Sequence, residues 1–144
     1  MSNLDIFLRL GAAALVGGLI GLEREFHGKH AGLRTHCLVS LGSALIMLVS
    51  IEIYNIYHNS VQVDPGRIAA QVVTGVGFLG AGTIIRSGTG IVGLTTAAGL
   101  WTASAIGLAC GLGYFNAAII ASGIALCVLI IFSKVGRKLG GRDV

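Results

Sequence analysis

Residues 115–132 are FNAAIIASGIALCVLIIF. This stretch carries no charged side chain and is close to the ~20 apolar residues that a helix needs to cross ~30 Å of hydrocarbon. Four further apolar segments precede it, with predicted bounds near residues 4–22, 35–54, 68–85 and 91–112. None shows the ten-residue alternation of a membrane barrel strand. The sequence therefore predicts an all-α fold, a polytopic bundle of about five transmembrane helices with almost nothing outside the bilayer.

The composition supports the same fold class. Of the 144 residues, 54% are hydrophobic and only 11% are charged, whereas ordinary soluble domains carry about 25% charged residues. The chain has 23 glycines but one proline, which excludes collagen and is typical of closely packed membrane helices. We expect one domain over residues 1–144, with the lipid bilayer as its surroundings.

The basic residues predict the orientation in the membrane. Eight of the ten lie in alternate loops and in the C-terminal tail, and these are Arg24, Lys29, Arg34, Arg86, Lys134, Arg137, Lys138 and Arg142. Cytoplasmic loops are enriched in Lys and Arg, so the C-terminus is predicted inside and the N-terminus outside. Because these charges sit at helix ends, they indicate topology and no nucleic-acid partner. Arg9 interrupts the first apolar segment, so we expect that segment to be retained and not cleaved as a signal peptide.

The glycines have two possible roles. Residues 75–80, GVGFLG, match a dinucleotide-binding pattern, but they lie inside an apolar span and lack the preceding strand that this pattern requires. Close helix packing is the favoured role, and the glycines predicted to serve it are Gly17, Gly21, Gly77, Gly80, Gly82, Gly107 and Gly111. Gly17 and Gly21 are also the predicted surface of a homodimer or larger assembly. Alternatively, the third segment is locally unwound and faces an ion.

Polar residues at the segment ends form the candidate functional site. Charged groups in hydrocarbon are costly, so they tend to face the bundle interior and pair. The candidates are Glu23, Arg24, Glu25, Arg34, Thr35, Asp64, Arg67, Gln71, Thr74, Arg86, Thr95 and Thr96.

Two pairings are predicted among these candidates. Glu25 would meet Arg34 on the cytoplasmic side, where Arg24 is the other predicted partner for a carboxylate. Asp64, Arg67 and Gln71 would meet on the outer side. The competing interpretation is that Asp64 caps a helix and that Arg67 extends to the interface. Arg86 with the turn at residues 87–90 could hold an anion.

Catalytic, metal-binding and cofactor motifs are not predicted. The three cysteines, Cys37, Cys110 and Cys127, lie in apolar runs and are interpreted as small buried hydrophobic residues. The histidines near residues 27–36 lack tight metal-ligand spacing on an assured helix. We find no Ser-His-Asp pairing, Walker motif or nucleophile elbow, so the sequence indicates that the protein is not an enzyme and needs no cofactor.

Four motifs in order resemble the MgtC/SapB family. They are residues 21–25 (GLERE), 31–36 (AGLRTH), 67–82 (RIAAQVVTGVGFLGAG) and 93–98 (GLTTAA), the last followed by Leu100-Trp101. The resemblance implies a protein of the bacterial inner membrane associated with magnesium limitation, acid stress and survival of pathogens inside host cells. Many members of the family carry a C-terminal cytoplasmic domain, which we expect this sequence, ending at Val144, to lack. The older label of a magnesium-transport ATPase subunit has no support in these residues.

Three hypotheses for function follow. The first is a regulatory membrane protein that acts in magnesium-limitation or acid-stress adaptation, or in virulence, by contacting other membrane proteins. The second is a transporter or channel for a small ion (Mg²⁺, K⁺ or H⁺) that uses the charged residues in its membrane spans. The third, an enzyme acting on lipid, has no supporting residue constellation.

Overall fold

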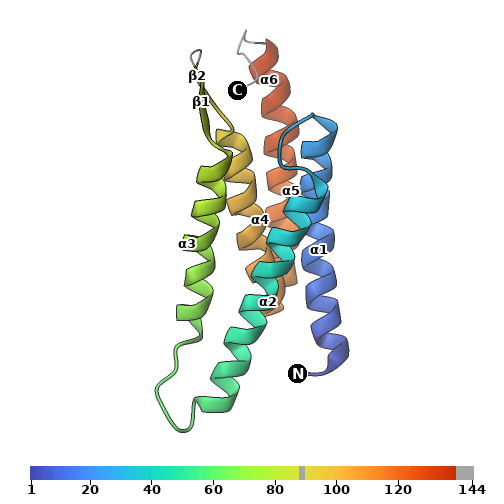
Figure 1. The fold of residues 1–144 in the computed structure, drawn as a ribbon. Coiled ribbons are helices and arrows are strands. Elements are labelled where there is room, and N and C mark those ends of the chain that lie inside the picture. The colour runs from blue at the N-terminus through green and yellow to red at the C-terminus, as the bar shows by residue number, and fades with distance from the viewer. Residues whose placement is uncertain (88–89, 139–144) are drawn as a thin grey trace.

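The fold is a bundle of helical rods with one short β-hairpin. The computed structural model describes residues 1–87 and 90–138. Along the chain, the elements are α1 (Asn3–Phe26), α2 (Leu33–Tyr57), α3 (Pro65–Thr83), β1 (Ile85–Ser87), β2 (Gly90–Val92), α4 (Leu94–Leu112), α5 (Phe115–Cys127), the π-helical segment η1 (Val128–Phe132) and α6 (Ser133–Lys138). α5, η1 and α6 form one continuous rod (Figure 1). The predicted all-α transmembrane bundle is confirmed.

Four helices are long and apolar enough to cross a membrane. They are α1, α2, α4 and the rod over Phe115–Val135, judged on the described residues. α3 has the same 19-residue length as α4, but Arg67, Gln71 and Thr74 dilute its apolar character. Its packing along α2 and α4 nevertheless makes it part of the same bundle (Figure 1).

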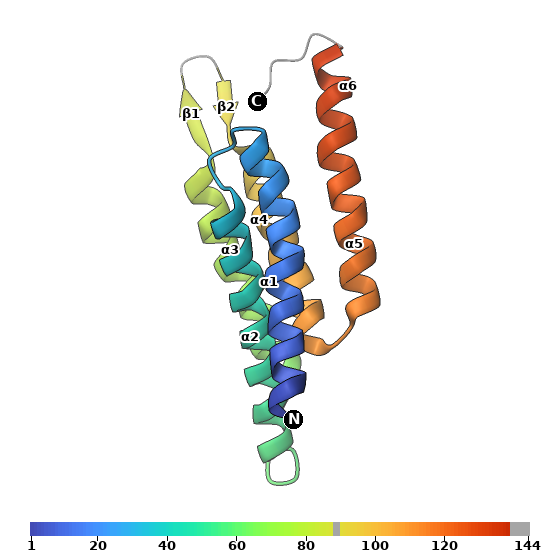
Figure 2. The same cartoon turned by 90° about the vertical axis from the view of Figure 1, so that its right-hand side faces the viewer.

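The core lies where α1, α2 and α4 meet. α3 packs beside α2 and α4, whereas the α5 rod stands on the other side, next to α4 and α1 (Figure 2). Small and branched side chains fill the core, which comprises Ala13, Val16, Ile20, Ala44, Ile106, Cys110 and Ala118. Such short side chains allow the helix backbones to approach closely, which is how membrane helices gain dispersion energy without a hydrophobic effect between them.

Glycine contacts explain how closely the three central helices approach. A Cβ on Gly107 would collide with the Ser40 carbonyl oxygen, and one on Gly111 would lie 2.5 Å from the Ala44 carbonyl oxygen. On α1, a Cβ on Gly17 would lie 2.5 Å from the Ser40 Cβ, and one on Gly21 would lie 2.8 Å from the Gly32 carbonyl oxygen. The prediction that Gly17 and Gly21 form a dimer surface is wrong, because both are buried against α2 of the same chain.

Only one of the three α3 glycines predicted to pack closely is in contact with a neighbouring helix. Gly80 packs on α4, where an added Cβ would lie 3.5 Å from the Ala97 Cβ. Gly77 and Gly82 have open space where a Cβ would be, so the prediction that they thin the packing side of α3 is wrong for this bundle. The physical reason is helical phase: α3 packs through Val72, Val76 and Gly80, spaced four apart, and the other two glycines fall outside that stripe.

A β-hairpin joins α3 to α4, where the sequence predicted helix ends and a compact turn. Ile85 pairs with Val92 and Arg86 with Ile91, in antiparallel register. Gly93 then starts α4 with φ of 94°, a conformation that suits glycine. α3 itself is one uninterrupted α-helix, so the alternative of an unwound third segment is not observed. Residues 88 and 89 of the predicted anion-binding turn lie outside the described residues.

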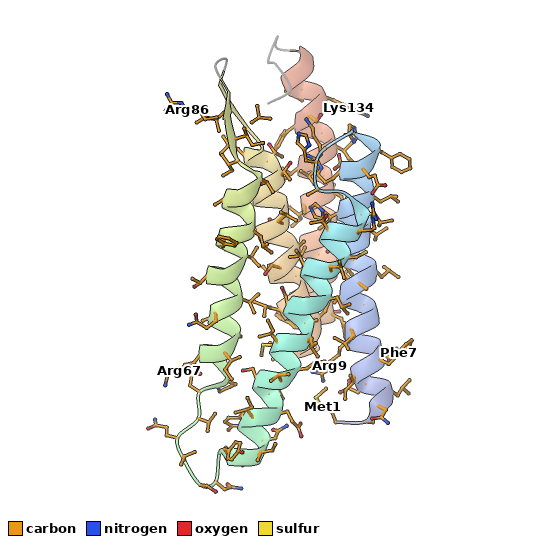
Figure 3. All side chains as sticks on the ribbon, in the orientation of Figure 1. Met1, Phe7, Arg9, Arg67, Arg86 and Lys134 are labelled. Carbon is orange, nitrogen blue, oxygen red and sulfur yellow. The ribbon has the colours of Figure 1, made fainter. Side chains whose placement is uncertain are left out.

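The charged ends of the bundle are separated along its length. Arg86 and Lys134 lie at one end, and Arg9 and Arg67 lie at the other, near Met1 (Figure 3). The α1–α2 connection, which carries Lys29, lies at the first end (Figures 1 and 2). Antiparallel helices place alternate loops at the same end of a bundle, so this arrangement agrees with the basic residues lying in alternate loops. The orientation relative to the cytoplasm stays a prediction.

Candidate functional site

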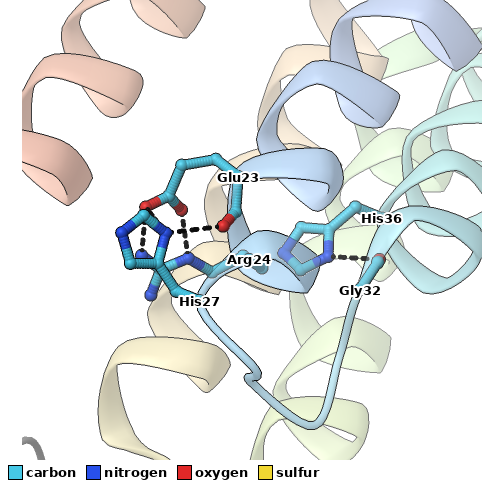
Figure 4. A network of polar contacts seen from close by, with 5 residues as sticks. All are labelled: Glu23, Arg24, His27, Gly32 and His36. Atoms are coloured by element: carbon cyan, nitrogen blue, oxygen red, sulfur yellow. Dashed lines mark hydrogen bonds and ion pairs between the residues drawn. The ribbon is translucent and has the colours of Figure 1, made fainter.

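A buried ion pair lies at the end of α1. Glu23 and Arg24 are only 8% and 3% exposed. Arg24 Nη2 donates to Glu23 Oε1 over 2.7 Å, and Arg24 Nε donates to Glu23 Oε2. The guanidinium therefore holds the carboxylate by both oxygens, the geometry in which an arginine–carboxylate pair is strongest (Figure 4). Both residues were candidates from the sequence, and Arg24 was one of the two partners predicted for a carboxylate at this end.

His27 completes the outer side of this pair. Its Nδ1 lies 3.1 Å from Glu23 Oε1 and 2.9 Å from the Glu23 carbonyl oxygen. The chain leaves α1 at this point, and the backbone N–H of His27 also donates to the Glu23 carbonyl. Because the imidazole is partly exposed whereas Glu23 is buried, His27 separates the carboxylate from the surface.

His36 lies beside the ion pair (Figure 4), and one of its ring nitrogens has no hydrogen-bond partner among the described residues. It is 0% exposed, and its Nδ1 donates to the Gly32 carbonyl oxygen over 3.0 Å (Figure 4). Since a carbonyl can only accept, Nε2 carries the lone pair in the neutral ring. Nε2 has no hydrogen-bond partner among the described residues, and a Cβ on Gly99 of α4 would lie 3.3 Å from it. An unsatisfied acceptor in so buried a position costs free energy and marks a functional candidate.

A line of hydroxyl groups continues from His36 along α2. Ser40 is 0% exposed, and its Oγ has no partner within the described residues. Ser43 donates to the Val39 carbonyl oxygen over 2.7 Å and lies 3.1 Å from Ser104 Oγ of α4. This line of hydroxyl groups was not predicted from the sequence. The spacing of residues 36, 40 and 43 places them on one helix face, and that spacing is the signal that could have found it.

The predicted pairing of Glu25 with Arg34 is wrong. Both side chains are exposed, as is Thr35. Glu25 Oε2 instead accepts the backbone N–H of Leu33 over 2.8 Å. The reason is local: Gly32, the N-cap of α2, offers no side chain to its first turn, so the Glu25 carboxylate binds a free amide at the positive end of that helix.

The predicted interior cluster on the other side is also wrong. Asp64, Arg67 and Gln71 are all exposed, and so is Thr74. Asp64 Oδ1 accepts from Gly66 N over 2.8 Å, which confirms the competing prediction that it caps α3. Because α3 faces the bundle through Val72 and Val76, its polar residues fall on the outward faces.

Arg9 makes an interhelical tie at the end of the bundle near Met1 (Figure 3). Its Nε lies 3.1 Å from Asp5 Oδ1, and its Nη1 donates to the Gly111 carbonyl oxygen over 2.9 Å. A guanidinium at the C-terminal end of α4 satisfies a carbonyl that the helix leaves free and complements the helix dipole. The sequence showed Arg9 as a charge within the first apolar segment but predicted no partner for it.

The remaining candidates lie at the start of α4 and on the hairpin. Arg86 and Thr95 are exposed, and Thr96 is 4% exposed. No group of three or more His, Cys, Asp and Glu side chains that could hold a metal ion is found in residues 1–87 and 90–138. The arrangement can neutralise a buried carboxylate and offers two unsatisfied polar atoms to water or a small polar ligand.

The comparisons with known proteins agree with the motifs of the sequence. The sequence model of the MgtC family matches residues 10–138. The chain is 48% identical over 143 residues to the "Putative magnesium transporter YhiD" of Escherichia coli K12, covering 96% of this chain and 66% of that protein. It is 46% identical to "Protein MgtC" of Salmonella typhimurium and 40% identical to "Protein SapB" of Bacillus subtilis, with 92% and 94% of this chain and 54% and 60% of those proteins covered. The chain thus spans about half to two thirds of the length of these relatives. No solved structure was found to match.

Proposed function

Because this chain belongs to the MgtC family of membrane proteins, we propose that it is a regulatory protein of the bacterial inner membrane. It acts in adaptation to magnesium limitation or acid stress, or in virulence, by contacting other membrane proteins. The α1–α2 loop and the C-terminus face the cytoplasm. The link to magnesium has support in the name of one relative, the "Putative magnesium transporter YhiD".

One observation supports this proposal: the outward face of α3 carries exposed polar side chains, which suit contact with protein better than contact with lipid. Arg67, Gln71 and Thr74 are exposed on α3, which packs on the bundle through its other side, and Phe78 is 81% exposed. A polar amide at that depth must find hydrogen bonds, and hydrocarbon offers none. A groove of about 590 Å³ between α2 and α3 adjoins this face, and Gln71 lines it.

A second copy of this chain is one partner that the same face fits. The Gln71 amide both donates and accepts, so two copies related by a two-fold axis can satisfy each other. The homodimer or larger assembly that we propose therefore meets through α3. Replacing Gln71 by Leu should shift the assembly toward monomer in native mass spectrometry, whereas Ile119→Leu on the exposed face of α5 should not. Monomers of the unaltered chain in several mild detergents would contradict this part of the proposal.

The alternative function, transport of Mg²⁺, K⁺ or H⁺, is favoured by the buried line of His36, Ser40 and Ser43. For Mg²⁺ the chemistry is unfavourable, because this ion prefers carboxylate and carbonyl oxygens with several waters. Glu23, the carboxylate buried beside this line, is already held by Arg24. Its charge is thus neutralised within the protein and is not available to a cation.

The deciding experiment uses the purified chain in liposomes that contain a magnesium-sensitive dye. We expect magnesium influx equal to that of empty vesicles, with potassium and pH dyes behaving alike. In parallel, a photo-crosslinking amino acid at position 78 in cells should trap protein partners, whereas the same group at position 119, which is also exposed, should not. An ion flux that disappears in a His36→Phe variant would overturn the regulatory proposal in favour of transport.

A further inference from the structure

Two cavities of different character meet at Thr95, at the start of α4. The first, the polar cavity, has walls of mixed polar and apolar character and a volume of about 130 Å³, and it is lined by Gly28, Lys29, His30, Val92, Gly93, Thr95 and Thr96. The second is apolar, has a volume of about 450 Å³ and runs between α4, α1 and the α5 rod. Since Thr95 lines both, the two cavities adjoin.

The polar cavity suits an anion. Lys29 and His30 come from the α1–α2 connection, and no acidic side chain is among the described residues that line the cavity. Thr95 and Thr96 of the first turn of α4 line it, and the N-cap of that helix is Gly93, which supplies no side-chain cap. The amides of a helix's first turn lack acceptors within the helix, and that end carries a partial positive charge. Lys29, the His30 imidazole and the N-terminal end of α4 thus all favour a negative charge in this cavity.

The apolar cavity suits a hydrocarbon chain. Ile20, Ala98, Gly99 and Ile124 are among its lining residues, with Val128 and Leu129 of η1 near its Thr95 end and Thr102 and Ala121 at its other end. Ala98 is exposed and Ile124 is 60% exposed, so the cavity opens along the side of the bundle, where lipid tails lie. Thr102, a polar residue of the lining, already donates its hydroxyl to the Ala98 carbonyl oxygen. This hydroxyl is therefore satisfied within the helix and does not need a polar ligand.

We infer that these two cavities together bind one anionic phospholipid, with its phosphate at Lys29 and His30 and one acyl chain between α4 and the α5 rod. The match is in both charge and position: the polar cavity with Lys29 lies at the end of the bundle that holds most of the basic residues, and the apolar cavity lies next to it along the span. A free phosphate would use only the first cavity. A zwitterionic lipid would use the second but would gain less from the first, because the positive choline group repels Lys29.

The binding experiment compares lipids on the purified full chain. Native mass spectrometry and thermal unfolding in detergent would be recorded with added phosphatidylglycerol, with phosphatidylcholine of the same chains, and with inorganic phosphate alone. We expect phosphatidylglycerol to be retained at least about fivefold more than phosphatidylcholine, the ratio expected for one lysine–phosphate attraction at a membrane surface. Phosphatidylglycerol should also raise the unfolding midpoint, whereas inorganic phosphate should not.

Three variants test the assignment to these residues. The double change Lys29→Gln/His30→Gln should remove the preference for phosphatidylglycerol while phosphatidylcholine retention stays the same. Ala98→Leu, which fills the apolar cavity, should reduce retention of both lipids. Arg86→Gln is the matched control, because Arg86 is exposed at the same end of the bundle but lines neither cavity.

Two outcomes would overturn the inference. If the double variant keeps the full preference, the anion is held elsewhere. If inorganic phosphate stabilises the protein as much as phosphatidylglycerol does, the apolar cavity plays no part. Neither outcome bears on the absence of ion flux or on crosslinking at position 78, so the proposed function can fail or survive independently.

Discussion

Breaking the ion pair of Glu23 and Arg24 should destabilise the protein far more than removing an exposed charge. Arg24 is 3% exposed and its guanidinium is held by both carboxylate oxygens. Truncating one partner of a buried pair leaves the other charge without compensation, which costs about 3–5 kcal/mol. We expect Glu23→Met to lie at the upper end of this range. Arg24→Met should cost less, because His27 remains beside the Glu23 carboxylate.

The double variant provides the sharper test. Glu23→Met/Arg24→Met removes both charges and keeps apolar volume, so it should recover much of the loss, as buried pairs replaced by apolar residues often do. The coupling free energy from the double-mutant cycle should therefore reach at least about 2 kcal/mol.

The assay is reversible unfolding in mixed micelles, with the free energy of unfolding obtained for each variant. Arg34→Met is the matched control, since Arg34 is exposed at the same end of the bundle, and it should change the free energy of unfolding by at most about 0.5 kcal/mol. If the losses of the Glu23 and Arg24 single variants are small and simply add, the pair does not act as a buried unit and the electrostatic reasoning is refuted.

Three further predictions follow from the packing and the charge distribution. Gly107→Ala should lower the free energy of unfolding by about 1–3 kcal/mol, because its Cβ would collide with the Ser40 carbonyl oxygen; Gly77→Ala, which meets open space, should cause no loss in the same assay, and equal losses would contradict the packing. Arg9→Met should cost about 1.5–3 kcal/mol through the lost charge-assisted hydrogen bond to the Gly111 carbonyl, and a change within the error of the unfolding measurement would show that this bond is not formed. In a cysteine-free background, cysteine at position 59 should react with an impermeant thiol reagent on intact cells and cysteine at position 30 should not; the reverse pattern would invert the topology.

Part of this protein follows from its sequence because the membrane imposes strong rules. Apolar segments of about 20 residues predict membrane-spanning helices, and the basic residues in alternate loops predict an odd number of crossings. The segment at residues 115–132 fell within the rod that begins at Phe115. Asp64 as a helix cap follows equally from local chemistry, because its interaction with Gly66 spans only two residues.

The partners of the polar side chains depend on helix rotation, which composition does not reveal. Glu25 and Arg34 were expected to pair because both carry charge near the same interface, yet Glu25 binds an amide that Gly32 leaves uncapped. A rotation of α1 by a fraction of a turn decides that Glu23, and not Glu25, is buried with Arg24. The same argument applies to α3, where Val72 faces the bundle and its neighbour Gln71 faces outward.

The sequence by itself thus determined that the chain crosses the membrane as a glycine-rich helical bundle, because hydrocarbon requires every backbone group to be satisfied within its own segment. Tertiary structure alone decided which glycines are contacts, which charges pair, and that polar and apolar cavities meet at Thr95. These features depend on how neighbouring helices are rotated and packed against each other. The free energy that favours this packing comes from many close contacts between helices across the whole bundle, so no single segment of sequence encodes it.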